Sequence, residues 1–449
     1  MDRDKMLNML QSYAGTGIYR RVPVSREIYA DAFTPIEVMR TLRAASRHCY
    51  LLESAEDRQQ WGRYSFLGYA PVMEITCTDG HMMIAEGKED EEKTIREFDT
   101  EDPGQVIREI LVRYKSPVIE GMPSFTGGLV GYFSYDYMKY QEPSLKPALE
   151  KKGQKEFRDV DLMLFDRVIV FDNYRQKLIL IAGVSLEGDL EENLKSAEAE
   201  LTQMEKLIRS RAKGSLFDTY RVLRTTNPSP YMFYFSSDDI EVAGASPETL
   251  AKLENRKIFT FPLAGTRPRG KTKEEDLALE KELLEDEKEL AEHNMLVDLG
   301  RNDLGRISIP GTVHVEKHME IERFSHVMHI GSTVSGELKP EMDAVDAIQA
   351  ILPAGTLSGA PKIRACEIIS QLEKRKRGIY GGAVGYLDFG GNMDTCISIR
   401  LAYKKNGIVC VQSGAGIVAD SVPEREFEEC RNKAGAVRRA LELAEGGLE

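Results

Sequence analysis

The chain has 449 residues, of which 42% are hydrophobic and 30% charged, and its formal net charge is −13. This acidic balance argues against a nucleic-acid partner, and no apolar run approaches the roughly 18 residues that a membrane helix needs. The charged start, MDRDKMLNML, is unlike a secretory leader. We therefore expect a soluble, cytoplasmic protein whose six scattered cysteines are reduced structural thiols.

The first 185 residues show short alternating runs that are typical of strands. These runs include VMEITCT, MMIAE, DLMLFDRVIVFD and KLILIAGVS, and PGQVIREILVRYKS between them predicts a helix. We expect residues 1–185 to form an N-terminal region. A charged helical segment follows at Leu186–Ala212, and we expect it to be a solvent-exposed connector over residues 186–213.

The pattern changes from Gly214 onward, where long amphipathic helices alternate with β-branched or glycine-rich strands. We expect residues 214–449 to form a second, catalytic domain. Strands in clusters, with helices between them but no regular βαβ alternation, predict an α+β fold.

The stretch FPLAGTRPRG (261–270) follows the strand-like run KIFTF. Its glycines let backbone N–H groups approach a ligand, while threonine and arginine supply donors for an anion. The loop therefore predicts an anion-binding site, although a plain alanine, Ala264, occupies its centre.

Two acidic helices are predicted further on. EKELLEDEKELAEHNMLVDLGRND (280–303) has no helix breaker before Gly300, so Glu285, Glu289 and Glu292 would share one face. SVPEREFEECRNKAGAVRRALELAEG (421–446) would carry Glu426, Glu429 and Lys433 on one face and a core stripe of Phe427, Cys430, Ala434, Val437 and Leu441. The alternative interpretation is that both acidic faces are simply solvated.

The stretch Gly414–Ala415–Gly416, which precedes the second helix, can cradle an anion with its backbone N–H groups. Carboxylates beside an anion need a cation such as Mg²⁺.

Four shorter motifs carry single conspicuous side chains. GASPET places Glu248 after a tight turn, GGAVGY ends at Tyr386, CISIRL puts Arg400 on a predicted strand, and HVMHIGS contains His329. Three of them have a structural alternative: GASPET could be a plain turn, Arg400 an ion-pair partner and His329 a core histidine. The two histidines of HVMH lack further ligands, so a zinc site is not favoured.

Together these stretches resemble the chorismate-utilising enzymes, most closely the large subunit, component I, of anthranilate synthase. The resemblance is carried by LLESAE, GRYSFLG, NPSPYMFYF, GASPET, PLAGTRPRG, EKELAEHNMLVDLGRNDLGRI, HVMHIGSTVSGEL, AGTLSGAPKIRA, GGAVGY, DTCISIR and GAGIVADSVPEREFEECRNKA. It implies two large antiparallel sheets with flanking helices. It also implies a lyase that converts chorismate and ammonia to anthranilate and pyruvate.

The resemblance implies roles for individual residues. Glu248 would be the general acid on the departing ring hydroxyl, and His329 would assist the later elimination of pyruvate. The substrate would be bound by Gly265, Thr266, Tyr386, Arg400, Gly414, Ala415, Gly416 and Lys433. One Mg²⁺ would be surrounded, directly or through water, by Glu289, Glu292, Glu426 and Glu429.

Ala264 bears on the nucleophile. In aminodeoxychorismate synthases the corresponding stretch resembles PIKGT and carries a lysine nucleophile. An alanine in this position provides no nucleophile, so ammonia would attack chorismate directly. Isochorismate and salicylate synthases can also carry alanine, so they remain alternatives.

Two further motifs, LLES and NPSPYM, resemble the feedback site for tryptophan in anthranilate synthases. The implied inhibitor residues are Leu52, Glu53, Ser54, Pro230, Tyr231 and Met232. For LLES alone, the end of a core strand is the alternative interpretation.

The family obtains ammonia from a glutamine amidotransferase subunit, and the resemblance implies assembly with such a subunit into a heterotetramer. No Cys–His nucleophile arrangement is visible here, so the glutaminase would be a separate chain. Relatives also carry several dozen more residues between Lys213 and Gly214, including a strand that resembles GDIFQVVLS. Its loss would expose unpaired backbone and open the site to water, so a catalytically impaired, tryptophan-binding homologue is a further alternative.

Overall fold

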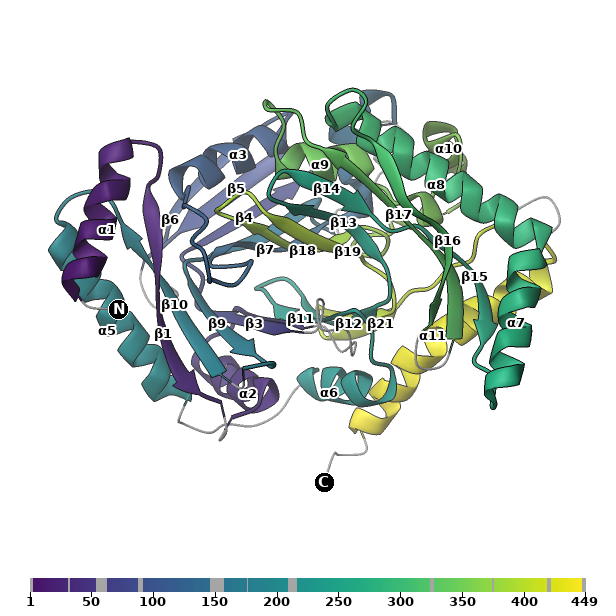
Figure 1. The fold of residues 1–449 in the computed structure, drawn as a ribbon, viewed down its shortest axis with the longest axis horizontal. Coiled ribbons are helices and arrows are strands. Elements are labelled where there is room, and N and C mark those ends of the chain that lie inside the picture. The colour runs from purple at the N-terminus through teal and green to yellow at the C-terminus, as the bar shows by residue number, and fades with distance from the viewer. Residues whose placement is uncertain are drawn as a thin grey trace.

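Two large antiparallel sheets form the framework of the computed structural model of this chain (Figure 1). The structure describes residues 3–30, 33–53, 63–87, 92–145, 157–175, 177–208, 216–323, 327–373, 375–417 and 421–445. The first sheet has nine strands, in the order β1 (Arg21–Tyr29), β10 (Lys177–Ser185), β9 (Arg167–Asp172), β3 (Tyr64–Tyr69), β2 (Cys49–Glu53), β11 (Tyr231–Ser236), β12 (Glu241–Ser246), β20 (Leu401–Lys405) and β21 (Ile408–Val411).

The second sheet has twelve strands. Their order is β15 (Leu263–Pro268), β17 (Val327–Glu337), β14 (Lys257–Thr260), β13 (Thr249–Glu254), β19 (Met393–Ile397), β18 (Ala383–Asp388), β7 (Gly128–Phe133), β8 (Val160–Phe165), β4 (Met73–Thr78), β5 (His81–Glu86) and β6 (Thr94–Asp99), with β16 (His314–Arg323) paired to β17. This architecture confirms the predicted α+β fold with two antiparallel sheets.

Helices cover the outer faces of the two sheets (Figure 1). They are α1 (Arg3–Thr16), α2 (Pro35–Ala45), α3 (Pro103–Arg113), α5 (Leu190–Ile208), α6 (Phe217–Thr226), α7 (Lys273–Glu285), α8 (Glu287–Ile307), α9 (Ala344–Ile351), α10 (Lys362–Leu372) and α11 (Pro423–Glu445), with short 3₁₀ turns η1 (Tyr135–Tyr140), η2 (Pro143–Leu145) and η3 (Gly355–Leu357). None of the described helices combines the length and apolar character needed to cross a bilayer.

Strand alternation divides the apolar side chains among three main cores. On β2, Leu51 packs toward helices α2 and α6, while Tyr50 joins the core between the sheets. The outer face of the second sheet packs against α3, α8 and α9, for example through Ile107, Val297 and Ile348. Successive side chains of a strand point to opposite faces of its sheet, and apolar side chains on both faces are buried, one set under helices and the other between the sheets.

The helix α5 differs from the expected solvent-exposed connector. Its residues Leu194, Ala197, Leu201, Met204 and Ile208 are buried, and it packs on β10. A 3.6-residue apolar period runs through its charged sequence, and this stripe buries the helix on the first sheet. The two predicted regions also share both sheets. The predicted junction, Lys213/Gly214, lies outside the described residues.

The first acidic segment forms two helices rather than one. α7 ends at Glu285 and α8 begins at Glu287, because the Asp286 carboxylate accepts hydrogen bonds from the N–H groups of Lys288 and Glu289 and caps the second helix. Glu289 and Glu292 share α8, as predicted, but Glu285 belongs to the preceding helix. Local side-chain capping thus competes with helix continuation at this position.

Candidate active site

The centre of the candidate site lies where the chain passes twice between the two sheets. Glu248 joins β12 of the first sheet to β13 of the second, and Arg400 joins β19 of the second sheet to β20 of the first. The Ile397 N–H donates to the Glu248 carbonyl at 3.0 Å, and the Ala245 N–H donates to the Arg400 carbonyl at 3.1 Å. The two crossings are therefore hydrogen-bonded neighbours.

The Glu248 side chain faces a cationic environment. Burial raises the pKa of this carboxyl to about 7, against the opposing effects of a Thr356 hydrogen bond and the charges of Arg400 and Lys433. The Thr356 hydroxyl donates to Oε1 at 3.3 Å. A carboxyl with this pKa is protonated for part of its population at neutral pH, so it can donate a proton.

Arg400 has a backbone φ of +51° and lies just before β20, not within a strand as the sequence had predicted. This left-handed conformation is uncommon for a non-glycine residue, and it turns the chain sharply between the sheets. Burial lowers the pKa of Arg400, and Glu248 partly offsets that effect. Strained backbone conformations of this kind are frequent at active sites, where they fix the direction of a side chain.

The predicted anion loop forms β15 and contains a bulge. The register against β17 shifts between Ala264 and Thr266, and Gly265 between them has φ +65°. His329 on β17 donates from Nδ1 to the Gly265 carbonyl at 2.9 Å, and that nitrogen lies 3.1 Å from the Thr266 hydroxyl oxygen. A carbonyl can only accept, so Nδ1 carries the proton and Nε2 is the basic nitrogen. Burial lowers the pKa of this histidine, which favours its neutral form.

Glu289 connects this loop to α8. A Cβ added to Gly265 would lie 3.3 Å from Glu289 Oε2, so the carboxylate packs directly against the bulge. Burial raises the pKa of Glu289, with a further contribution from the charge of Glu292 one turn later. Two carboxylates held this close favour a cation.

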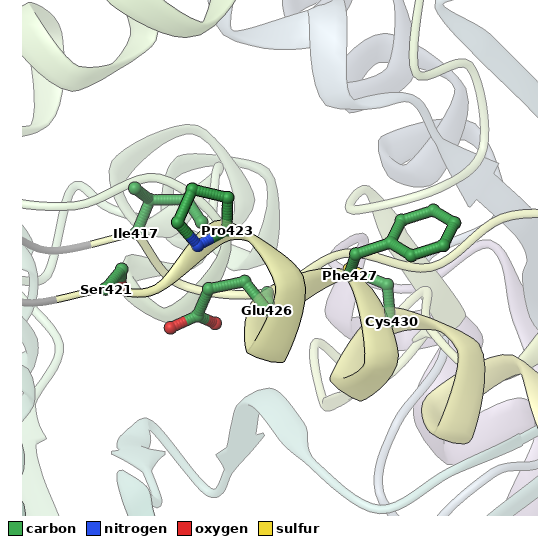
Figure 2. A pocket seen from close by; sticks show the side chains of 7 residues that line it. Ile417, Ser421, Pro423, Glu426, Phe427 and Cys430 are labelled. Carbon is green, nitrogen blue, oxygen red and sulfur yellow. The ribbon is translucent and has the colours of Figure 1, made fainter.

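α11 supplies the opposite side of the candidate site. Lys433 Nζ lies 2.6 Å from Glu429 Oε1 and 3.5 Å from the Gly414 carbonyl oxygen. A hollow of about 380 Å³ lies beside the helix start; its lining residues are Ala415, Ile417, Ser421, Pro423, Glu426, Phe427 and Cys430. Figure 2 shows Glu426 and Phe427 pointing to different sides of α11.

The four predicted metal ligands lie on two helices, Glu289 and Glu292 on α8 and Glu426 and Glu429 on α11. Within the described segments, their carboxylates do not form a group of three whose oxygens lie within 4.8 Å of one another. Glu429 is paired with Lys433.

Tyr386 lies on β18, in the core between the sheets. Its ring centroid is 4.5 Å from that of Phe125, and its hydroxyl is 3.3 Å from the Ser124 hydroxyl. Tyr380 lies against the predicted substrate loop, because a Cβ added to Gly414 would lie 2.9 Å from its hydroxyl oxygen. Sequence reasoning missed Tyr380 and Thr356. Tyr380 stands directly before the GGAVGY motif, and Thr356 belongs to the quoted AGTLSGAPKIRA.

The predicted tryptophan residues meet on adjacent strands. Met232 pairs with Glu53, and Phe233 pairs with Leu52, so β2 and β11 are neighbours. Leu52 and Tyr231 border the core between the sheets, and the Tyr231 hydroxyl donates to Asp394 at 2.8 Å. Pro230 directly precedes β11, and Ser54 lies outside the described residues.

Glu53 points away from the core between the sheets. Its Oε1 accepts hydrogen bonds from the Tyr220 hydroxyl and Arg224 Nε, both at 2.5 Å. Its carboxylate therefore connects β2 to α6.

Comparison with known proteins identifies the family of the chain. The chorismate binding enzyme family matches residues 201–439. Anthranilate synthase component 1 of Acetivibrio thermocellus is 42% identical over 95% of this chain and 96% of its own length. The Pseudomonas aeruginosa protein of the same name is also 42% identical, over the full length of both chains. That alignment spans 506 positions, so several dozen positions of the relative have no counterpart among these 449 residues.

Solved structures show the same fold. The crystal structure of anthranilate synthase component I from Streptococcus pneumoniae TIGR4 has a TM-score of 0.72 and 35% identity, covering 85% of this chain and 93% of that one. The menaquinone-specific isochorismate synthase of Escherichia coli, at 18% identity, has a TM-score of 0.65 over 97% of this chain and 98% of its own, and so shares the fold. The chain belongs to the chorismate binding enzymes and is an enzyme of the anthranilate synthase component 1 type.

Proposed function

We propose that this chain forms anthranilate and pyruvate from chorismate and ammonia. The observation that carries the proposal is the Glu248 carboxyl, with a pKa of about 7, facing Arg400 where the chain crosses between the sheets. Chorismate is a dicarboxylate, so its reaction requires cationic and N–H donors beside a proton donor. Arg400, Lys433 and the amides of Gly414–Gly416 provide such donors.

In the proposed reaction, two side chains of this chain transfer protons. Glu248 donates its proton to the ring hydroxyl, which leaves as water while ammonia forms the new C–N bond, and the resulting ammonium group then loses one proton to solvent. His329 Nε2 accepts the ring proton as the C–O bond to the enolpyruvyl group breaks, and the enolpyruvate that leaves takes up a proton on its methylene carbon to become pyruvate. Ala264 offers no competing nucleophile. Thr356, through its hydrogen bond to Glu248, would orient the acid.

The residues present fit a Mg²⁺ ion in their chemistry. Glu289 and Glu292 on α8 and Glu426 and Glu429 on α11 are hard oxygen ligands. Burial, and after it the charge of Glu292, raises the pKa of Glu289, and a bound cation would offset both effects. We propose that these four side chains hold Mg²⁺, which requires Glu429 to exchange its Lys433 partner. When bound, the ion would supply positive charge to the ring carboxylate.

The proposal also includes feedback inhibition and a partner. Tryptophan would bind beside β2 and β11, where Leu52 and Tyr231 border the core between the sheets. Ammonia would be delivered by a separate glutamine amidotransferase subunit, within a heterotetramer. The name component 1, carried by the relatives, supports a second component.

Replacing Glu248 tests directly whether this residue is the general acid. Glu248→Gln should lower kcat by about 100-fold or more while retaining chorismate binding, because it removes the proton donor and keeps the shape. Glu254→Gln is the matched control, since Glu254 is an exposed glutamate at the far end of β13, the strand that Glu248 precedes. Equal turnover of Glu248→Gln and wild type would refute the role of Glu248.

One observation favours a second candidate, a catalytically impaired tryptophan-binding homologue. β21 pairs only with β20 among the described strands, and the nearby side chains of Ile408, Ile417 and Phe427 are 65%, 72% and 66% exposed. Together with the longer alignments, this indicates a site more open than one closed by an additional strand. Saturable tryptophan binding without turnover of chorismate would support this candidate over the first.

A further inference from the structure

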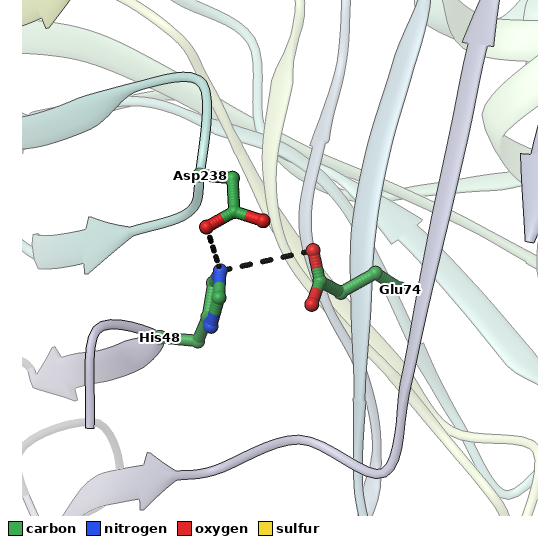
Figure 3. A group of neighbouring side chains, drawn as sticks. All are labelled: His48, Glu74 and Asp238. Carbon is green, nitrogen blue, oxygen red and sulfur yellow. Dashed lines mark ion pairs between the residues drawn. The ribbon is translucent and has the colours of Figure 1, made fainter. Parts of the chain in front are cut away.

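A compact group of possible metal ligands lies outside the candidate active site. His48, Glu74 and Asp238 come from three different segments: the residue before β2, the strand β4 and the turn between β11 and β12. Figure 3 shows the His48 ring pointing toward both carboxylates. β2 and β11–β12 belong to the first sheet and β4 to the second, so the group bridges the two sheets.

The distances suit one shared ion. His48 Nε2 lies 2.9 Å from Asp238 Oδ1 and 3.7 Å from Glu74 Oε2, and one ligand atom of each residue lies within 4.8 Å of the others. Ligand atoms about 2.1 Å from a common ion are separated by roughly 3 to 3.5 Å. Small side-chain movements would therefore place all three around one metal.

Burial distinguishes this group from a surface ion pair. The side chains of His48 and Glu74 are 2% and 9% exposed, whereas that of Asp238 is 55% exposed. His48 and Glu74 would therefore be the rigid, buried ligands, and Asp238 would lie on the side from which the ion enters from solvent. Lys93 pairs with Oε1 of Glu74, so Oε2 is the oxygen directed at His48.

We propose that His48, Glu74 and Asp238 form a binding site for a divalent transition metal such as Zn²⁺. One imidazole and two carboxylates suit Zn²⁺ better than Mg²⁺, because imidazole nitrogen is a borderline-soft ligand. Water would complete the coordination on the exposed side. The bound metal would connect the two sheets and stabilise the fold independently of the proposed catalysis.

The test uses the untagged full chain, freed of metal with a chelator and kept in excess Mg²⁺ to saturate all-oxygen sites. Calorimetric titration with Zn²⁺ should give one site per chain, and the thermal unfolding midpoint should rise with Zn²⁺ concentration. His48→Gln and Asp238→Asn should each weaken Zn²⁺ binding by about tenfold or more and remove the rise in the midpoint.

His81→Gln is the matched control. His81 also faces two carboxylates, those of Asp99 at 2.9 Å and Glu97 at 3.9 Å, but it does so through different ring nitrogens, and its side chain is exposed. It should bind Zn²⁺ as wild type does. Unchanged Zn²⁺ affinity in both His48→Gln and Asp238→Asn, each folded by circular dichroism, would overturn the proposal. The absence of saturable binding in wild type would also overturn it and leave the group as an ion pair.

Discussion

Glu248 and Arg400 obtain their chemistry from their positions at the two crossings between the sheets. Each residue separates a strand of one sheet from a strand of the other, and their backbones are connected by hydrogen bonds of 3.0 and 3.1 Å with flanking residues. The crossing reduces hydration of the carboxyl and raises its pKa. The motifs indicated which residues to consider, but only the topology places them together.

The pKa of Glu248 predicts an alkaline loss of activity. A general acid works in its protonated form, and the protonated fraction falls about tenfold for each pH unit above a pKa of about 7. At a constant concentration of unprotonated ammonia, kcat/KM should therefore decrease as pH rises past neutrality. A profile that stays flat from pH 6 to pH 9 would contradict this assignment.

The metal proposal predicts a contrast between two adjacent glutamates of α11. Glu429→Gln should reduce Mg²⁺-dependent turnover by about 100-fold or more, because it removes a proposed ligand. Tryptophan binding should be unchanged. Glu428→Gln is the control, since Glu428 is an exposed residue that pairs with Arg431. Equal Mg²⁺ dependence of the two variants, measured by titration, would exclude Glu429 from the metal site.

At the scale of elements, the bulge in β15 determines how the anion loop meets its neighbours. Gly265 has φ +65°, and a Cβ there would lie 2.8 Å from Leu283 and 3.3 Å from Glu289. Gly265→Ala should lower the free energy of unfolding by about 1–3 kcal/mol and reduce turnover, because backbone strain and steric contact both act at the site.

Gly311→Ala separates these two effects. Gly311 has a similar positive φ of +84°, but a Cβ there would meet nothing within 4 Å. It should lose stability in chemical denaturation while retaining full turnover. Equal activity of Gly265→Ala and wild type would show that the bulge does not shape the site.

Glu53 predicts a structural effect on the neighbouring helix. Its buried carboxylate accepts hydrogen bonds from Tyr220 and Arg224 of α6. Glu53→Gln should reduce the free energy of unfolding by about 1–3 kcal/mol, since charge-assisted hydrogen bonds to a buried group weaken. Tyr220→Phe should reduce the free energy of unfolding by less, because Arg224 remains paired with Glu53. Denaturant curves for both variants measure this, and an unchanged midpoint for Glu53→Gln would contradict it.

Sequence patterns predicted elements better than their boundaries and surroundings. The runs in β4, β5, β8–β10 and α3 were correct, but α5 was taken as exposed because its charges hid an apolar stripe. The Asp286 cap divides a segment that helix propensity alone would continue. In α11, Val437 is buried, yet Phe427 from the same predicted stripe is 66% exposed. The helical period alone does not show which part of the apolar stripe of α11 is covered.

At the scale of the whole molecule, both sheets combine strands from the two halves of the chain. The resemblance implied two antiparallel sheets, and the structure confirms them. The order of the strands and the proximity of Glu248 to Arg400 depend on long-range pairing, which local patterns do not encode. The same limit explains why the sequence could not locate Tyr386 in the core between the sheets or detect the group around His48.

Among the described strands, β21 is an edge that pairs only with β20. The Pseudomonas aeruginosa relative aligns over 506 positions, against 449 residues here. In the more open site that the second candidate function assumes, water would compete with the hydrogen bonds and charges that stabilise the reacting groups. Catalysis by this chain would therefore show that the donors at the two crossings and on α11 are sufficient for turnover without an additional strand.

The most direct test is to mix the purified chain with chorismate, Mg²⁺ and ammonium at mildly alkaline pH and to identify the product by fluorescence and mass spectrometry. We expect anthranilate and pyruvate in equal amounts, with their formation suppressed by tryptophan. Isochorismate or salicylate as the product would contradict this expectation by showing that water, not ammonia, is the nucleophile. No product from a folded, tryptophan-binding chain would contradict the catalytic claim and support the impaired homologue.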